Sequence, residues 1–296
     1  LSIDLVKIMK LDVIWQEIML LGESPLWQKI KKCLYWVDIV AATLCRLDND
    51  GSTQKFTMPS EIGSIAWSDK GGLIAALSDR FVSINTKTGA TQNIACPLQG
   101  IKGVMFNDGK CDRQGRFWAG TKDIEEKRPL GSLYCLDKES KVAEMLNGFT
   151  VSNGIAWNLD NSVMYICDSP ARQIYQYEFD PIKGCLGQVQ VFVQVPEEEG
   201  FPDGLTVDSE GYLWSCHWDG WRITRYSSTG EVDSVISMPV PRPTSCCFGG
   251  PELKTLYVTS ASIGLSAAKL ADAPQSGQVF AIELDVKGLP EPAYLG

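Results

Sequence analysis

Short stretches of alternating apolar and polar residues follow one another along almost the whole chain. They end in turns rich in Gly, Asp and Asn, as in LYWVDI, FVSINT, VMYICD and QVFAIELD. Alternation with a period of two residues, bounded by such turns, is typical of β-strands and hairpins. No long stretch keeps a clean apolar stripe of helical period, and residues 138–146, which come nearest to one, are left unassigned. The pattern predicts an all-β fold.

The strand-like runs group into six similar units. Each opens with a polar or Gly-containing turn and a short apolar strand, such as GSIAWS, NGIAWN or DGLTVD, and continues with a second strand such as DSEGYLWSC or DRQGRFWAG. The units begin near Glu23, Ile62, Asn107, Asn153, Asp203 and Thr244. A period of roughly 40 to 50 residues is typical of propeller blades. We therefore expect a six-bladed β-propeller with four-stranded antiparallel blades, although counting alone leaves five or seven blades open.

The last unit, which ends in GQVFAIELDVKG, lacks one strand. The N-terminal segment DVIWQEIML, at about residues 12–20, can supply it. Pairing the first and last strands closes the ring. The sequence thus predicts a single propeller domain over residues 1–296.

The net charge and the cysteine pattern limit which partners and which cellular compartment are expected for this protein. The net charge is −9, which makes nucleic acid and anionic membranes poor partners, and no apolar run is long enough to span a bilayer. The ten cysteines form no CxxC pair, and the N-terminus has no clean apolar region of a signal peptide. These features favour scattered buried thiols in a reducing compartment. We expect a cytoplasmic protein, a monomer, that binds a small molecule.

Four polar signatures recur at the starts of these units. They are Glu23 in LGESPLW, Asn107 in FNDGKCD, Asn153 in VSNGIAW and Asp203 in FPDGLTV. Each alone is compatible with an ordinary turn, because Asn and Asp beside Gly are common turn residues. Four in equivalent positions favour a different interpretation, since the first strand of each propeller blade lines the central axis. Their oxygen atoms are then expected to converge there and to form a site for a hard cation.

Carboxylate and amide oxygens without His or Cys favour Ca²⁺, Mg²⁺ or Mn²⁺ over structural zinc. Three protein ligands leave coordination positions open for water and substrate, which is typical of a catalytic metal. Other chemistries have little support. The single histidine, His217, and the absence of a GxSxG motif disfavour a Ser-His-Asp hydrolase. For His217 we expect packing or hydrogen bonding, with substrate contact as the alternative.

The segments LGESPLW, FNDGKCDRQGRFWAGT, GFTVSNGIAW and FPDGLTVD, in this order, resemble the senescence marker protein/gluconolactonase/regucalcin family of six-bladed propellers. The resemblance runs from about Leu21 to Leu284. Members of that family hydrolyse sugar lactones to aldonic acids, some cleave organophosphates, and the animal members are also described as calcium-binding regulators.

The resemblance implies roles for individual residues. Glu23, Asn153 and Asp203 match the three protein ligands of one divalent cation, whether calcium, zinc, manganese, magnesium or iron(II). Asn107 matches a residue that contacts the substrate or a metal-bound water, and Glu125 matches an acidic residue that hydrogen-bonds sugar hydroxyls in some members. Where vertebrate members carry a substrate-contacting Arg, this chain has Met105, so its contacts to the substrate are expected to differ.

The resulting hypothesis is metal-dependent hydrolysis of a sugar-acid lactone. Asp203 is expected to take a proton from the attacking water, while the cation polarises the ester. Two alternatives remain open at this point. The same site could cleave a phosphotriester, for which the apolar Met105 is suited, or the protein could be a calcium-binding regulator without turnover.

Overall fold

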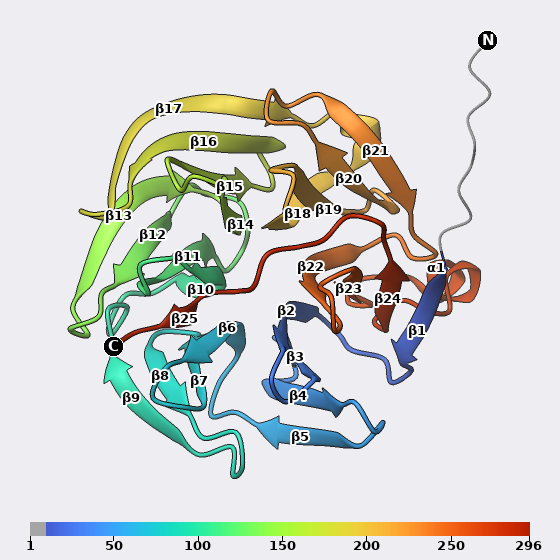
Figure 1. The fold of residues 1–296 in the computed structure, drawn as a ribbon, viewed down its shortest axis with the longest axis horizontal. Coiled ribbons are helices and arrows are strands. Elements are labelled where there is room, and N and C mark those ends of the chain that lie inside the picture. Colours follow the sequence, from blue (N-terminus) through green and yellow to red (C-terminus); the bar gives the residue numbers. More distant parts are fainter. Residues whose placement is uncertain (1–9) are drawn as a thin grey trace.

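The computed structural model describes residues 10–296, and these are almost entirely β-strands. Six small antiparallel sheets stand around a common centre as the blades of a propeller (Figure 1). Each blade has four antiparallel strands, which confirms the predicted fold class. The expected domain range also includes residues 1–9, which lie outside the described residues.

The first three blades follow one another along the chain. Blade 1 contains β2 (Gly22–Gln28), β3 (Cys33–Asp38), β4 (Thr43–Asp48) and β5 (Thr53–Thr57). Blade 2 contains β6 (Ile62–Ser68), β7 (Leu73–Leu77), β8 (Phe81–Ile84) and β9 (Thr91–Ala95). Blade 3 contains β10 (Val104–Cys111), β11 (Phe117–Asp123), β12 (Gly131–Leu136) and β13 (Val142–Phe149).

The last three blades complete the ring. Blade 4 contains β14 (Ser152–Trp157), β15 (Val163–Asp168), β16 (Gln173–Asp180) and β17 (Cys185–Gln194). A 3-10 turn, η1 (Glu197–Glu199), leads to blade 5, with β18 (Phe201–Val207), β19 (Leu213–Trp218), β20 (Arg222–Tyr226) and β21 (Val232–Ser237). Blade 6 contains β22 (Pro243–Gly249), β23 (Thr255–Ser260), β24 (Val279–Glu283) and β1 (Leu11–Trp15).

Strands near the two ends of the described chain hold the ring together. Strand β1 pairs antiparallel with β24 and is the outer strand of blade 6, the place expected for the N-terminal segment. The strand ends at Trp15, whereas the expected range extended to about residue 20, because the residues after Trp15 turn towards blade 1. The C-terminal segment crosses the middle of the ring, and β25 (Ala293–Tyr294) pairs parallel with β6 of blade 2 (Figure 1).

Two elements were not foreseen from the sequence pattern. The unassigned segment 138–146 is a turn over residues 138–141 followed by the first five residues of the outer strand β13. The short helix α1 (Ala267–Asp272) lies between β23 and β24, with the Ser266 side chain accepting from the backbone N–H of Lys269 at its N-terminus. Six helical residues are too few to show a 3.6-residue period.

Apolar side chains fill the space between neighbouring blades. Blades 3 and 4, for example, share a cluster in which Trp118, Trp157 and Phe179 meet with ring centroids 5.8 to 6.3 Å apart. Second strands are therefore covered on both faces, and all six residues of β3 are buried. Eight of the ten cysteines are buried and all ten are free, which confirms the prediction of scattered thiols. No helix of residues 10–296 is long and apolar enough to cross a membrane.

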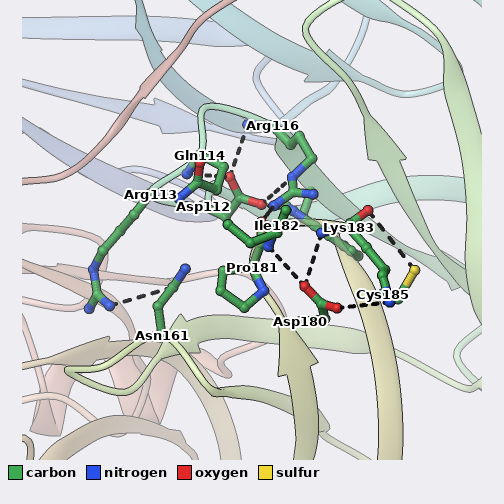
Figure 2. Close-up of polar contacts among 11 residues, drawn as sticks. Asp112, Arg113, Gln114, Arg116, Asn161, Asp180, Pro181, Ile182, Lys183 and Cys185 are labelled. Carbon is green, nitrogen blue, oxygen red and sulfur yellow. Dashed lines mark hydrogen bonds and ion pairs between the residues drawn. The ribbon is translucent and has the colours of Figure 1, made fainter.

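A buried ion pair strengthens the turn between β10 and β11 (Figure 2). Asp112 is fully buried and accepts hydrogen bonds from the Nε of Arg116 at 2.6 Å and the indole N–H of Trp118 at 3.0 Å. It also accepts from two backbone N–H groups of its own turn. Arg116 then donates to the carbonyl of Pro181 in blade 4. One carboxylate thus stabilises a turn and, through Arg116, the contact between two blades.

Candidate metal and substrate site

The four sequence signatures lie where the inner strands depart from regular pairing. Strands β2, β10, β14 and β18 each show a register shift next to the signature residue, between Glu23 and Leu26 in the case of β2. Such a bulge redirects a side chain away from the usual alternation. The polar side chains at these positions therefore face the central axis instead of the apolar space between blades.

Glycine allows the inner strands to approach one another closely. A Cβ atom at Gly154, where φ is +37°, would lie 2.3 Å from the carbonyl oxygen of Asp203. A Cβ at Gly204 would lie 2.3 Å from the Oγ of Ser245. Glycine is therefore a packing requirement at both positions, because a larger residue would push β14 away from β18 at Gly154 and β18 away from β22 at Gly204.

These strands surround a cavity of about 310 Å³. The structure brings four of the predicted residues into its wall, namely Glu23, Asn107, Asn153 and Asp203. All four are buried, with at most 7% of any residue exposed. The remaining lining residues are Leu21, Lys122, Glu126, Val151, Ser169, Pro170, Phe201 and Trp218.

Two oxygen atoms at this cavity have no hydrogen-bond partner. They are the Oδ1 atoms of Asn153 and Asp203, both fully buried. The amide of Asn153 is held in one orientation, since its Nδ2 donates to the Oγ of Ser169 at 3.2 Å. Buried oxygens are normally satisfied, so an unpartnered pair in one cavity points to a missing electropositive partner.

The carboxylates have an unfavourable environment without a cation. The pKa of Glu23 is raised well above its usual value by burial, then by the nearby charges of Asp203 and Asp108. The pKa of Asp203 is raised well above its usual value by burial and by Asp108. Two buried carboxylates and a fixed carboxamide oxygen fit a hard divalent cation. Among residues 10–296 no group of three His, Cys, Asp or Glu side chains is placed to hold a metal, so a site here depends on the amide of Asn153.

Asn107 is held between blades 3 and 4. Its Nδ2 donates to the backbone carbonyl of Ser152 at 3.2 Å. Ser152 precedes Asn153, so this hydrogen bond joins the strand of one predicted substrate residue to the strand of a predicted ligand. Asn107 thus lines the cavity in a fixed orientation, as a residue that contacts the substrate requires.

The structure does not bring Glu125 to the cavity. Its side chain is 64% exposed and lies 3.5 Å from the Nζ of Lys127. The following residue, Glu126, lines the cavity instead, at a position with φ of +55°. The reason is the tight turn after β11, in which the N–H of Glu126 donates to the carbonyl of Asp123 and turns the backbone there. The acidic side chain that this turn presents to the cavity is therefore Glu126.

Met105 also lies outside the cavity wall. It packs against the apolar cluster between blades 1 and 2. Its direct partner across the β10–β11 pair is Lys122, which does line the cavity. Sequence reasoning missed Lys122 and Glu126 because neither belongs to a motif, and a charged residue near a strand end is usually exposed.

Two aromatic rings give the cavity an apolar part of its wall, in contrast to the charged Lys122 and Glu126. Phe201 and Trp218 line the cavity, and each is covered by a guanidinium group. Arg172 lies 4.2 Å from the Phe201 ring and Arg242 lies 4.4 Å from the Trp218 ring. Such cation–π contacts hold the rings in place. A rigid apolar wall of this kind suits the face of a sugar ring.

His217 has a packing role. It is fully buried outside the cavity wall, with Nδ1 2.8 Å from the carbonyl oxygen of Glu199. Burial is the main cause that lowers the pKa of His217 to about 4. The imidazole is therefore neutral over the physiological range, which agrees with the expected packing or hydrogen-bonding role.

A column of charges fills the axis further along the inner strands. Asp108 accepts from the N–H of Gly109 at 2.7 Å. Lys110 donates to the carbonyl of Leu205 at 3.0 Å and to Glu291 of the C-terminal segment at 3.3 Å. The segment that crosses the ring in Figure 1 thus supplies the last carboxylate of the column.

The raised pKa values predict an unusual pH dependence for protein treated with a chelator. Folded Glu23 and Asp203 retain protons that the unfolded chain has lost above about pH 4. The folded state then binds more protons, so the free energy of unfolding falls as pH rises from about 4 through the raised pKa values. Thermal unfolding of wild type and Asp203→Asn across this range measures the effect. We expect a weaker fall in the variant, and parallel curves would contradict the assignment.

Known proteins are similar to this chain in sequence and in fold. Residues 21–262 match the family described as SMP-30/Gluconolactonase/LRE-like region. A 6-deoxy-6-sulfogluconolactonase from Pseudomonas putida is 38% identical over 278 residues, which cover 93% of this chain and 95% of that protein. Regucalcin from Homo sapiens is 33% identical over 295 residues, which cover 97% of this chain and 99% of that protein.

Solved structures of related proteins have the same fold as this chain. The crystal structure of a calcium-binding protein, regucalcin from Agrobacterium tumefaciens, matches with a TM-score of 0.93 and 26% identity over 97% of each chain. A gluconolactonase from Xanthomonas campestris shares the fold, with a TM-score of 0.76 and 19% identity over 93% of this chain and 90% of that one. Sequence and architecture together show that this protein belongs to the SMP-30/gluconolactonase/LRE-like family.

Proposed function

We propose that this protein is a lactonase that opens a sugar-acid lactone with the help of one divalent cation held by Glu23, Asn153 and Asp203. The observation that carries the proposal is the pair of buried, unpartnered oxygens of Asn153 and Asp203, beside a second buried carboxylate. The similarity to a 6-deoxy-6-sulfogluconolactonase supports the same class of substrate.

The charge of the cavity supports a dication. Its wall carries three carboxylates, Glu23, Glu126 and Asp203, and one ammonium group, Lys122. Two positive charges would bring this set to neutrality. When bound, such an ion would polarise the ester carbonyl of the substrate.

The residues of the chain have separate tasks in this mechanism. Asp203 has a second carboxylate oxygen that would take a proton from the attacking water and return it to the leaving alkoxide. Asn107 would hydrogen-bond the sugar, because its amide is fixed by the Ser152 carbonyl. Phe201 and Trp218 would bind the apolar face of the ring and exclude water from it. Glu23 and Asn153 would keep the cation in place.

The test is a reconstitution assay. Protein stripped with a chelator is supplied with calcium, zinc, manganese, magnesium or iron(II) and assayed by pH-stat against five- and six-carbon aldonolactones. We expect turnover only after a divalent ion is restored, because the ester needs a polarising group. A fluorophosphate in a parallel assay measures phosphotriester cleavage.

Two results would contradict the proposal. Full lactonase activity in the stripped protein would remove the role of the cation. Selective calcium binding without turnover of any lactone would identify a binding protein instead of an enzyme.

A further inference from the structure

Lys122 is the one cationic side chain in the cavity wall among residues 10–296. It extends from β11, and only 13% of its side chain is exposed. Its Nζ donates to Oε1 of Glu126 at 2.6 Å. An ammonium group has three hydrogens to donate. One goes to Glu126, so two remain for a molecule in the cavity.

The position of Lys122 relates it to a substrate contact. It pairs directly with Met105, where the family resemblance implies a cation, and the partly buried Met105 packs against the apolar cluster between blades 1 and 2. Lys122 is also close enough to the candidate ligands to lower the pKa of both Glu23 and Asp203. A group bound to Lys122 would therefore lie beside the reacting ester.

Resting on the lactonase function proposed above, we propose that Lys122, together with Glu126, selects lactones that carry two adjacent hydroxyl groups. The ammonium group only donates hydrogen bonds and the carboxylate only accepts them. Adjacent hydroxyls match this pair, because one accepts from Lys122 while the other donates to Glu126. The two protein atoms are 2.6 Å apart, close to the spacing of neighbouring hydrogen-bonding groups.

The surrounding charges favour a neutral diol over an anionic group. Glu126 already neutralises Lys122, and the carboxylates of Glu23 and Asp203 face the same cavity. A carboxylate or sulfonate bound to Lys122 would add a negative charge to a cavity wall that the proposed dication already makes neutral. A diol adds no charge and satisfies the donor and the acceptor together.

The experiment compares Lys122→Met with wild type on two substrates. Glucono-δ-lactone carries adjacent hydroxyls, and δ-valerolactone has the same ring without them. Methionine keeps an unbranched stem of similar length and removes the charge. We expect kcat/KM for glucono-δ-lactone to fall by about tenfold or more, since a site built for hydroxyls loses its charged donor. We expect kcat/KM for δ-valerolactone to fall by much less, because it makes no such contact and the loss of the positive charge near Asp203 affects both lactones alike.

Two controls separate selection from structure. Lys122→Arg keeps a cationic donor and is expected to retain the preference for the hydroxylated lactone. Calorimetric Mn²⁺ affinity of Lys122→Met is expected to be at least that of wild type, because a positive charge near two candidate ligands is gone. An equal fall on both lactones, a fall on neither, or a loss of Mn²⁺ affinity would overturn the inference.

If the protein is not a lactonase, the experiment gives a different result. Wild type would then hydrolyse neither lactone, and binding of intact glucono-δ-lactone can be measured by calorimetry. Weaker binding by Lys122→Met than by wild type would still support the inference, and equal binding would overturn it.

Discussion

Asp203→Asn is expected to lower kcat for lactone hydrolysis on the order of 10³-fold or more. The substitution keeps the shape of the side chain but removes the proton acceptor and one negative charge from the candidate cation site. Asp203 is 3% exposed and its Oδ1 has no hydrogen-bond partner, so no hydrogen bond of that oxygen to the protein is lost. The assay is initial-rate hydrolysis by pH-stat with saturating divalent ion.

The fold is expected to survive this change. Burial and nearby acids raise the pKa of Asp203, so a neutral amide relieves an unfavourable charge in protein without a cation. Thermal unfolding after chelation should show the variant to be at least as stable as wild type. Asp69→Asn, at an exposed turn after β6, is the matched control and should keep full activity. Normal turnover by Asp203→Asn would remove Asp203 from the mechanism.

Asp112→Ala is expected to lower the free energy of unfolding by about 3 to 5 kcal/mol. The change leaves the Arg116 guanidinium without its carboxylate (Figure 2). It also leaves the indole N–H of Trp118 without its acceptor, in a region where Asp112 is fully buried. Two backbone N–H groups of the turn also lose their acceptor. Urea unfolding followed by tryptophan fluorescence gives the free energy of unfolding.

A second substitution shows whether the loss comes from the ion pair. Arg116→Met in the Asp112→Ala background removes the uncompensated charge, so the double variant should be more stable than the sum of the two single effects predicts. Asp160→Ala, in an exposed turn where Asp160 accepts hydrogen bonds from Ser162, should change the stability by about 1 kcal/mol or less. Additive effects of Asp112→Ala and Arg116→Met would show that the two side chains do not act as a pair.

The architecture could be predicted because every blade repeats the same information. Alternating strands and a polar or Gly-containing turn at the start of each unit indicate six blades, and the structure has its inner strands at those places. The incomplete last unit also indicated a strand from the N-terminus, and β1 occupies that position. The local strand pattern and the closure of the ring both indicate the same architecture. Tertiary contacts therefore did not change the secondary structure that the pattern predicts.

The substrate side of the cavity was harder to predict. Glu125 and Glu126 are adjacent acidic residues, and the turn after β11 decides which one faces the cavity. No period or motif separates them, because the choice depends on the backbone conformation at one position. Lys122 was missed for a related reason, since its meaning depends on its partner across the strand pair, Met105. The C-terminal segment was not expected to cross the ring and place Glu291 against Lys110.

We propose that Glu23, Asn153 and Asp203 together bind one divalent cation on the propeller axis. The most direct measurement is the anomalous difference map of a crystal of the wild-type protein grown with Mn²⁺. We predict one strong peak on the propeller axis, within about 2.0 to 2.6 Å of an oxygen from each of the three side chains. A map with no peak at these oxygens, while lactone hydrolysis by the same preparation proceeds, would contradict the claim.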